Sequence, residues 1–294
     1  MRRERILLLA LAVLATLTWV GALGQRPVLT LTFLDVGQGD CTLIRTPEGR
    51  AVLVDGGGRR NASEAYDIGR RVVVPSLLVM GVRQLQAVIC THPHEDHCGG
   101  LAAVIRQVPV DVLLVPAAPC SPSTDWERLL AAARDCRVPV RRIREGVPLY
   151  LGREVACRVL GPPARPFAGT SADENNNSAV LALRYRGFTA LLTGDIERAA
   201  QERLLSRRAP VACTLFKVPH HGSDSALDER LLTVARPRLA VIMVGRNNAF
   251  GHPSRRVMRA FARRHVPVYR TDLQGAITVS TNGEDWHVRV AGVR

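Results

Sequence analysis

A short run of histidine and acidic residues is the part of this sequence best equipped for chemistry. It reads H-P-H-E-D-H over residues 92–97, and imidazole nitrogens and carboxylate oxygens are ligands that suit zinc, manganese or iron. His92 and His94 alternate in an extended segment, so both rings can point to the same side. Asp96 and His97 lie just beyond, where the chain changes direction. This offset favours two ligand pairs on two divalent metal ions, zinc or manganese, over one shared ion.

The flanking residues predict how this run is held. Residues 85–90 form an apolar stretch that is typical of a buried strand, and residues 101–105 are typical of the first turns of a helix. The candidate ligands therefore lie where a strand ends and a helix begins. Two ions about 3.5–4 Å apart can bind the attacking and the leaving oxygen in a displacement reaction at phosphorus. A polar loop with chance histidines is the alternative interpretation.

Two further strand ends carry candidate residues. Asp195 follows the predicted strand 188–192, and a carboxylate there is costly to bury unless it is paired or metal-bound. It is the candidate for a ligand shared by both ions, and an N-cap on the next helix is the alternative. His220 and His221 follow the predicted strand 213–218. One could complete the first metal's shell or bind a phosphoryl oxygen, and the other could protonate a leaving alkoxide, because imidazole titrates near neutral pH.

Four segments of the sequence carry a resemblance to a known family. The pattern H-x-H-x-D-H resembles the signature of the metallo-β-lactamase-fold hydrolases. The segments F-L-D-V-G-Q-G-D at 33–40, V-D-G-G at 54–57 and K-V-P-H-H-G-S at 217–223 are similar to the β-lactamase-like domain of ComEC, the membrane protein of DNA uptake in natural competence. The resemblance covers essentially residues 30–290. It implies an α/β (α+β) fold, the αββα sandwich, in which two packed β-sheets lie between helices and the metals lie at one edge.

The resemblance also implies roles for individual residues. One metal would take His92 and His94, the second would take Asp96, His97 and His252, and Asp195 would bridge them. A bridging water would then attack. The catalytic candidates are Asp96, His220 and His221, and the candidates for substrate contact or for support of the ligands are Asp40, Asp55, Asn177 and Ser223.

One position departs from the superfamily pattern. Many superfamily members carry a further His ligand shortly before the bridging Asp, and here that region offers Asn175–Asn177 and Ser178. The first metal is therefore expected to be bound weakly, or to be a non-zinc ion, because amide oxygens favour harder cations such as Mn²⁺.

The net charge of the chain and the absence of nucleotide-binding motifs indicate which partners to expect. The formal net charge is +14, and Lys217 is the only lysine among 40 basic residues. A basic surface can attract phosphate-rich partners such as DNA or anionic lipid, although a general preference for arginine would give the same charge. The chain has neither a G-x-x-x-x-G-K-[ST] loop nor a strand-linked G-x-G-x-x-G, so no nucleotide cofactor is expected.

The N-terminal residues predict an association with a membrane. Positive residues at positions 2, 3 and 5 precede an apolar run, 6–24, that is just long enough to cross a bilayer. This pattern predicts that residues 1–27 are a signal anchor or a signal peptide, and that residues 28–294 form the hydrolase domain. We therefore expect the domain outside the cytoplasm, at the cell membrane or secreted.

Several functions fit these features. The first hypothesis is a metal-dependent phosphodiesterase of ComEC type, a nuclease acting on DNA through a two-metal-activated water. The runner-up is a phosphodiesterase on cell-envelope material such as choline-bearing teichoic acids. A β-lactamase or thioester hydrolase is disfavoured by the missing upstream His. A non-catalytic DNA-binding module would be expected to have lost ligands, and none of the six core positions is lost.

Overall fold

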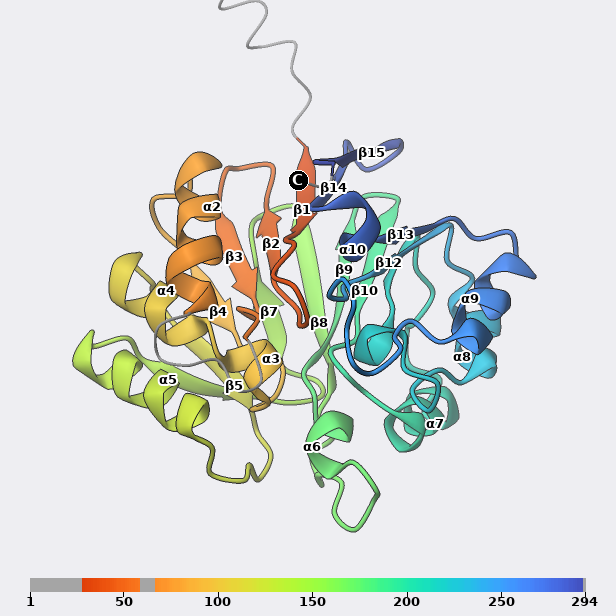
Figure 1. The fold of residues 1–294 in the computed structure, drawn as a ribbon, viewed down its shortest axis with the longest axis horizontal. Coiled ribbons are helices and arrows are strands. Elements are labelled where there is room, and N and C mark those ends of the chain that lie inside the picture. The colour runs from red at the N-terminus through yellow and green to blue at the C-terminus, as the bar shows by residue number, and fades with distance from the viewer. Residues whose placement is uncertain (1–27, 59–66, 293–294) are drawn as a thin grey trace, which may run out of the picture.

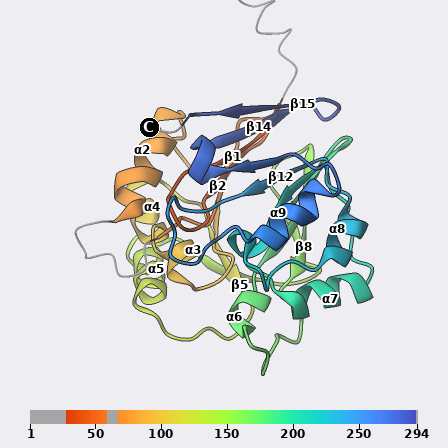
Figure 2. The same cartoon turned by 45° about the vertical axis from the view of Figure 1, so that its right-hand side comes forward.

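Two β-sheets lie face to face between two layers of helices (Figure 1). The computed structural model describes residues 28–58 and 67–292, so the predicted N-terminal hydrophobic segment, 1–27, lies outside the described residues. Within the described ranges, no helix has the length and apolar character needed to span a membrane. The turned view in Figure 2 shows the same order of layers. The predicted αββα sandwich is confirmed.

The first sheet combines an antiparallel half with a parallel half. Its antiparallel half joins the N-terminal strands to the last two strands of the chain, and parallel pairing begins where β3 meets β4. In spatial order the sheet holds β15 (Trp286–Val290), β14 (Ile277–Thr281), β1 (Leu29–Phe33), β2 (Thr42–Arg45), β3 (Ala51–Val54), β4 (Ala87–Ile89), β5 (Leu113–Pro116) and β6 (Val140–Ile143).

The second sheet repeats this plan. Parallel strands occupy one side and antiparallel strands the other, and the change occurs at β10. In spatial order the sheet holds β13 (Val268–Arg270), β12 (Leu239–Ile242), β11 (Leu215–Lys217), β10 (Phe188–Leu192), β9 (Val180–Tyr185), β8 (Val155–Gly161) and β7 (Pro148–Tyr150). Because parallel strands end at the same edge, each sheet delivers several carboxyl ends to one place.

Helices cover the outer face of each sheet. In Figure 1, α2, α4 and α5 lie on the side of the first sheet, and α7, α8 and α9 lie on the side of the second. The helices are η1 (Gly69–Val73), α2 (Val74–Val79), α3 (Glu95–Cys98), α4 (Leu101–Gln107), α5 (Thr124–Asp135), α6 (Asp173–Asn176), α7 (Arg198–Ser206), η2 (Pro219–Gly222), α8 (Glu229–Ala235), α9 (Arg255–Ala262) and α10 (Thr271–Gln274).

Helix starts follow their capping residues. Ser123 is the N-cap of α5, and its Oγ accepts a hydrogen bond from the Trp126 backbone N–H, 3.2 Å away. Ser254 caps α9 in the same way. Pro75 lies in the first turn of α2, directly after η1. A proline fits there because its fixed φ of about −65° is that of a helix.

Two hairpin turns differ in length. Tyr185 pairs with Phe188, so Arg186 and Gly187 form a two-residue turn between β9 and β10. The turn at Asn282-Gly283 is longer and spans 282–285, since Thr281 pairs with Trp286. The Asn282 side chain accepts hydrogen bonds from the backbone N–H groups of residues 284 and 285, which stabilises the longer turn.

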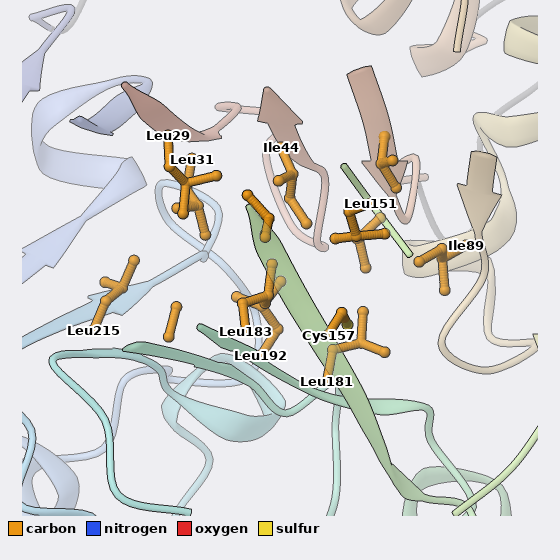
Figure 3. Packing of buried hydrophobic residues seen from close by; sticks show 14 of the residues in the cluster. Leu29, Leu31, Ile44, Ile89, Leu151, Cys157, Leu181, Leu183, Leu192 and Leu215 are labelled. Carbon is orange, nitrogen blue, oxygen red and sulfur yellow. The ribbon is translucent and has the colours of Figure 1, made fainter. Parts of the chain in front are cut away.

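The space between the sheets is filled by alternate residues of the strands. Leu29 and Leu31 of β1 are fully buried, and Figure 3 shows them facing Leu183 and Leu192 of the second sheet. Because side chains alternate along a strand, the intervening residues face the opposite side. The result is an apolar layer that holds the two sheets, and hence their strand ends, in a fixed relation.

Truncating a core side chain of the second sheet should destabilise the protein. Phe216 is fully buried, and its ring centroid lies 6.3 Å from that of Phe261 of α9. We expect Phe216→Ala to lower the free energy of unfolding by about 3–5 kcal/mol, measured by chemical denaturation. Phe250→Ala removes a ring that is 52% exposed and should stay within about 0.5 kcal/mol of the parent. Equal losses for the two variants would contradict this assignment of the core.

Candidate metal centre

The candidate residues gather at the carboxyl ends of strands from both sheets. His92 follows β4 of the first sheet, and Asp195 and His221 follow β10 and β11 of the second. β10 and β11 are parallel neighbours, and β4 is a parallel neighbour of β3, after which Asp55 lies. Crevices at such carboxyl ends are the usual ligand sites of α/β sheets. The packing of the sheets therefore brings together residues that are more than 100 positions apart.

Four side chains form the centre of the site. Asp96, His97, Asp195 and His221 each offer one ligand atom, and these atoms all lie within 4.8 Å of one another. Asp195 Oδ2 is 3.1 Å from His97 Nε2 and 3.3 Å from His221 Nε2. His221 Nε2 is also 3.1 Å from Asp96 Oδ2. We call these residues the four-residue cluster.

The outward nitrogens of the cluster histidines have fixed partners. His97 Nδ1 is 2.8 Å from Asp55 Oδ2, and His221 Nδ1 is 2.8 Å from the Met243 carbonyl oxygen. Asp55 also accepts hydrogen bonds from the backbone N–H and the hydroxyl of Thr91. Partners of this kind set the tautomer and the orientation of a metal-binding imidazole. Both Nε2 atoms are therefore aimed at the centre of the cluster.

A histidine pair lies beside the cluster. His92 Nε2 and His94 Nδ1 are 3.1 Å apart, and the His92 ring centroid is 4.1 Å from that of His97. The other nitrogen of His94, Nε2, is 3.0 Å from Glu174 Oε2. Glu174 is in turn held by Oε1, which accepts a hydrogen bond from the Ser121 backbone N–H. His94 thus presents Nδ1 beside His92 and turns Nε2 toward a carboxylate.

The sequence analysis missed three residues of this site. Glu174 stands directly before the amide run 175–177 and could have been noticed as a carboxylate beside it. Glu197 is the second, and its Oε1 lies 3.1 Å from His220 Nδ1. The ammonium group of Lys217 contacts the carboxylates of Asp40 and Asp195. For Lys217 the available signal was its rarity, because every other basic residue is arginine.

The backbone beside the cluster contains left-handed residues and a close approach at a glycine. His220 and His221 have positive φ angles of 47° and 53°, a conformation that costs an L-residue about 1–2 kcal/mol. This turn points the two rings in different directions, His221 into the cluster and His220 to its edge. On the opposite side, a Cβ at Gly39 would lie 2.2 Å from the Asp96 carbonyl oxygen. The chain there approaches Asp96 so closely that a glycine is required.

Charge pairing dominates the titration of the cluster. Burial lowers the pKa of His97, but the carboxylates of Asp195, Asp55 and Asp40 outweigh it, and the pKa lies well above 6.5. The pKa of His221 is raised in the same way, chiefly by Asp195. Burial raises the pKa of Asp195, but His97, His221 and Lys217 hold it well below 3.8. Without a metal ion, the cluster is therefore a network of buried ion pairs.

His92 differs from these histidines. Burial and the neighbouring His97 lower its pKa well below 6.5. Its imidazole is therefore neutral near physiological pH, the form that binds a metal ion. Its Nδ1 lies 3.1 Å from the Thr91 hydroxyl, which leaves Nε2 toward His94. His92 is thus ready to bind a metal ion without first losing a proton.

His252 lies outside the four-residue cluster. It was expected to join Asp96 and His97, and the structure places His221 beside them. The His252 ring centroid is 5.8 Å from that of His220. Burial and the nearby His221 and His220 lower the pKa of His252 to about 4, and its buried Nδ1 has no hydrogen-bond partner. Ligation by His252 stays a prediction.

The remaining candidates lie around the cluster. Asp40 Oδ1 is 3.4 Å from His221 Nδ1, which places this carboxylate behind the cluster. Ser223 shares a hydrogen bond with Ser225. Asn177 hydrogen-bonds through both ends of its amide to the backbone of Phe167, so it fixes the loop before α6 and does not face the metal candidates.

The cluster fits a divalent ion. The buried His97 Nε2 has no aligned hydrogen-bond partner, although it lies beside Asp195. Two imidazoles and two carboxylates form a donor set that suits zinc, manganese or iron. The pair His92 and His94 lies next to it and offers two more nitrogens. These residues could hold divalent metal ions, and one oxygen of Asp195, Oδ2, lies 3.1 Å from His97 Nε2 and 3.3 Å from His221 Nε2.

Comparison with known proteins identifies the family. The sequence model of the metallo-β-lactamase superfamily matches residues 34–246. The chain belongs to this superfamily. As a metallo-β-lactamase domain, it has the fold of a metal-dependent hydrolase with a candidate metal site at the expected sheet edge.

Relatives of this metallo-β-lactamase domain include competence proteins, as the sequence motifs indicated. ComE operon protein 3 of Bacillus subtilis is 31% identical over 83% of this chain and 32% of its own length. Competence protein ComA of Neisseria gonorrhoeae is 28% identical over 90% of this chain and 35% of its own length. The chain thus spans about a third of the length of these curated relatives.

Among solved structures, the diiron β-hydroxylase CmlA of Streptomyces venezuelae is similar in fold. Its TM-score is 0.51 at 15% identity, over 85% of this chain and 53% of that one. At this identity the likeness shows the fold alone.

The metal affinity of the domain should rise with pH. Metal binding must displace the protons of His97 and His221, because their pKa values are raised well above 6.5 in the metal-free protein. As pH increases through these raised values, fewer protons compete and the dissociation constant should fall. Calorimetric titration with Mn²⁺ from about pH 6 to pH 9, in buffers of different ionisation enthalpy, counts the released protons. A dissociation constant that does not change with pH would refute the proton competition.

Removing Glu174 should weaken metal binding at His94. The carboxylate fixes His94 Nε2 and so directs Nδ1 toward His92. Loss of such a partner typically costs about 10- to 100-fold in metal affinity, and we expect Glu174→Ala to follow this. Glu154→Ala is the control, because Glu154 pairs with Arg186 at the β9–β10 turn, at the other end of β10 from Asp195. Equal Mn²⁺ affinity of the two variants would argue against this role.

Proposed function

We propose that this domain is a binuclear metal-dependent phosphodiesterase that hydrolyses DNA. The observation that carries the proposal is the position of the His92–His94 pair directly beside the four-residue cluster of Asp96, His97, Asp195 and His221. Together these side chains offer ligands for two divalent ions. Two ions at such a site suit an in-line displacement at phosphorus.

The residues have distinct parts in this chemistry. Divalent ions, when bound, act as Lewis acids and make water a nucleophile near neutral pH. Asp195 Oδ2 lies between the histidines that would bind them. His220 stands at the edge of the cluster, partly exposed, with Nε2 4.0 Å from Asp195 Oδ2 and Nδ1 beside Glu197. We assign His220 to the delivery of a proton to the leaving oxygen, because it is a histidine at the partly exposed edge of the cluster.

DNA as the substrate rests on two supports. The relatives with the names of competence proteins match across most of this chain. The formal charge of +14 favours a polyanion. Since the relatives are about three times longer than the matched region, DNA cleavage is a proposal for this domain and not a property carried over from them.

The location of the domain is part of the proposal. The apolar run 6–24, which follows three arginines, supports a signal anchor or signal peptide with the domain outside the cytoplasm. N-terminal sequencing of the exported protein distinguishes the two. A mature chain that retains residues 1–27 is anchored, and one that begins after them is secreted. A protein found only inside the cytoplasm would overturn this part.

The activity can be tested with the full chain in mild detergent. We expect hydrolysis of bis-p-nitrophenyl phosphate and of DNA with Mn²⁺ or Zn²⁺, and its loss in EDTA, because the nucleophile requires the ions. His94→Ala should abolish hydrolysis, whereas His287→Ala, on the exposed face of the edge strand β15, should leave it unchanged. Activity that survives EDTA, or an active His94→Ala variant, would remove the two-metal mechanism.

A second candidate follows from an exposed ring. Phe250 is 52% exposed and stacks on His252, with ring centroids 5.5 Å apart. An aromatic face next to the site could bind the quaternary ammonium of a choline-bearing envelope phosphodiester. Comparing DNA with choline phosphodiesters as substrates separates the two functions. DNA that is bound but left intact in the presence of Mn²⁺ would instead favour a non-catalytic DNA-binding module.

A further inference from the structure

The only lysine of the chain lies inside the candidate metal centre. The sequence has 40 lysine and arginine residues, and Lys217 is the single lysine. It ends β11 and is buried, with 2% of its surface exposed. Burying an ammonium group is costly unless it is fully paired. A lone lysine at a buried position, in a chain that otherwise uses arginine, indicates a task specific to an ammonium group.

The contacts of Lys217 show this task. Its Nζ donates to the Gly194 carbonyl oxygen at 2.9 Å and lies 3.4 Å from Asp195 Oδ1. It also makes a close ion pair with the Asp40 carboxylate. These three acceptors match the three N–H groups of an ammonium. Two of the three acceptors are carboxylates, which compensate the buried positive charge of the ammonium group.

Lys217 divides the two oxygens of Asp195 between different partners. Oδ1 faces the ammonium, whereas Oδ2 faces His97 Nε2 at 3.1 Å and His221 Nε2 at 3.3 Å. We propose that Lys217 is a positioning residue that holds Asp195 so that a single oxygen, Oδ2, serves both metal ions. A carboxylate bound through one oxygen brings two ions closer together than one that spans them with both oxygens. Lys217 would therefore set the geometry of the metal pair without touching either ion.

Arginine is a poor substitute at this position. An ammonium is a compact point charge with three donors, whereas a guanidinium is planar and presents its donors in a fixed fork. The acceptors around Nζ come from three separate residues, Asp40, Gly194 and Asp195. Their surroundings are fully buried, so the larger planar group has no solvent-filled space to occupy. This explains why lysine stands here in an arginine-rich chain.

A purely structural role of Lys217 makes a different prediction. Lys217 could serve only to neutralise the buried Asp40, which is 3% exposed. Replacing both residues, as in Lys217→Met with Asp40→Asn, removes the buried charge pair together. If neutralisation were the whole role, this double variant would regain the stability of the parent and would bind metal as tightly as Asp40→Asn alone. If Lys217 positions Asp195, stability should recover while metal affinity should stay below that of Asp40→Asn.

The experiment compares the full-length parent with Lys217→Met, Lys217→Arg, Asp40→Asn and the double variant. Thermal unfolding of the metal-free proteins reports stability, and calorimetric titration with Mn²⁺ alone reports both binding events. We expect the double variant to melt near the parent but to bind Mn²⁺ about 10- to 100-fold more weakly, as is typical for loss of a residue that orients a ligand. Asp40→Asn keeps the contact of Lys217 with Asp195 and should bind more tightly than the double variant. Lys217→Arg should be as weak as Lys217→Met.

Two results would overturn the proposal. The first is a double variant with the Mn²⁺ affinity of Asp40→Asn. The second is a Lys217→Arg variant that binds Mn²⁺ as tightly as the parent. If the double variant does not fold, the Mn²⁺ affinity of Lys217→Arg tests the proposal by itself. The inference rests on the proposed function only in needing divalent ions at Asp195. Because affinity is measured without substrate, a protein that binds Mn²⁺ but cleaves no phosphodiester would refute the proposed function and leave the role of Lys217 intact.

Discussion

The buried carboxylate of Asp195 is the constraint on which the rest of the site depends. A carboxylate that is 1% exposed is stable only with positive partners, and here His97, His221 and Lys217 approach it from different elements. Two of these groups have further hydrogen-bond partners, which extend the network outward. Asp55 lies behind His97, and the Met243 carbonyl lies behind His221. In the metal-free protein, protons supply positive charge to the histidines. Divalent ions would supply it in their place, which makes one arrangement serve both stability and metal binding.

The two sheets make this network possible. Each sheet contributes parallel strands whose carboxyl ends point to one edge, and the apolar layer between the sheets fixes one edge against the other. The first sheet provides the histidine run after β4, and the second provides Asp195 and His221. Glycines such as Gly39 and the left-handed turn at His220 and His221 then allow the approach of backbone segments that ordinary residues would prevent. The local strain is tolerated because the surrounding layers are well packed.

Much of the fold was predictable because it follows local periodicity. The apolar runs at β4, β10 and β11, the hairpin at Arg186-Gly187 and the N-cap Ser123 all carry their own signals within a few residues. The site was predictable where ligand-type residues are consecutive, as in 92–97. It was not predictable where one residue acts across a long separation. The contact of Glu174 with His94 spans 80 positions, and that of Lys217 with Asp195 depends on which side of β11 faces the cluster.

The sequence by itself determined the kinds of ligand available, the strands that carry them and the superfamily to which they belong, because these are properties of short segments. Only the tertiary structure decided which ligands meet. His221 lies beside Asp96 and His97, since two consecutive left-handed residues turn its ring inward. Glu174 and Lys217 likewise belong to the site because of contacts with residues far away in the sequence. The packing of one sheet on the other determines which side chains are buried close together. A pattern along the chain does not contain the distance between residues that are far apart in sequence.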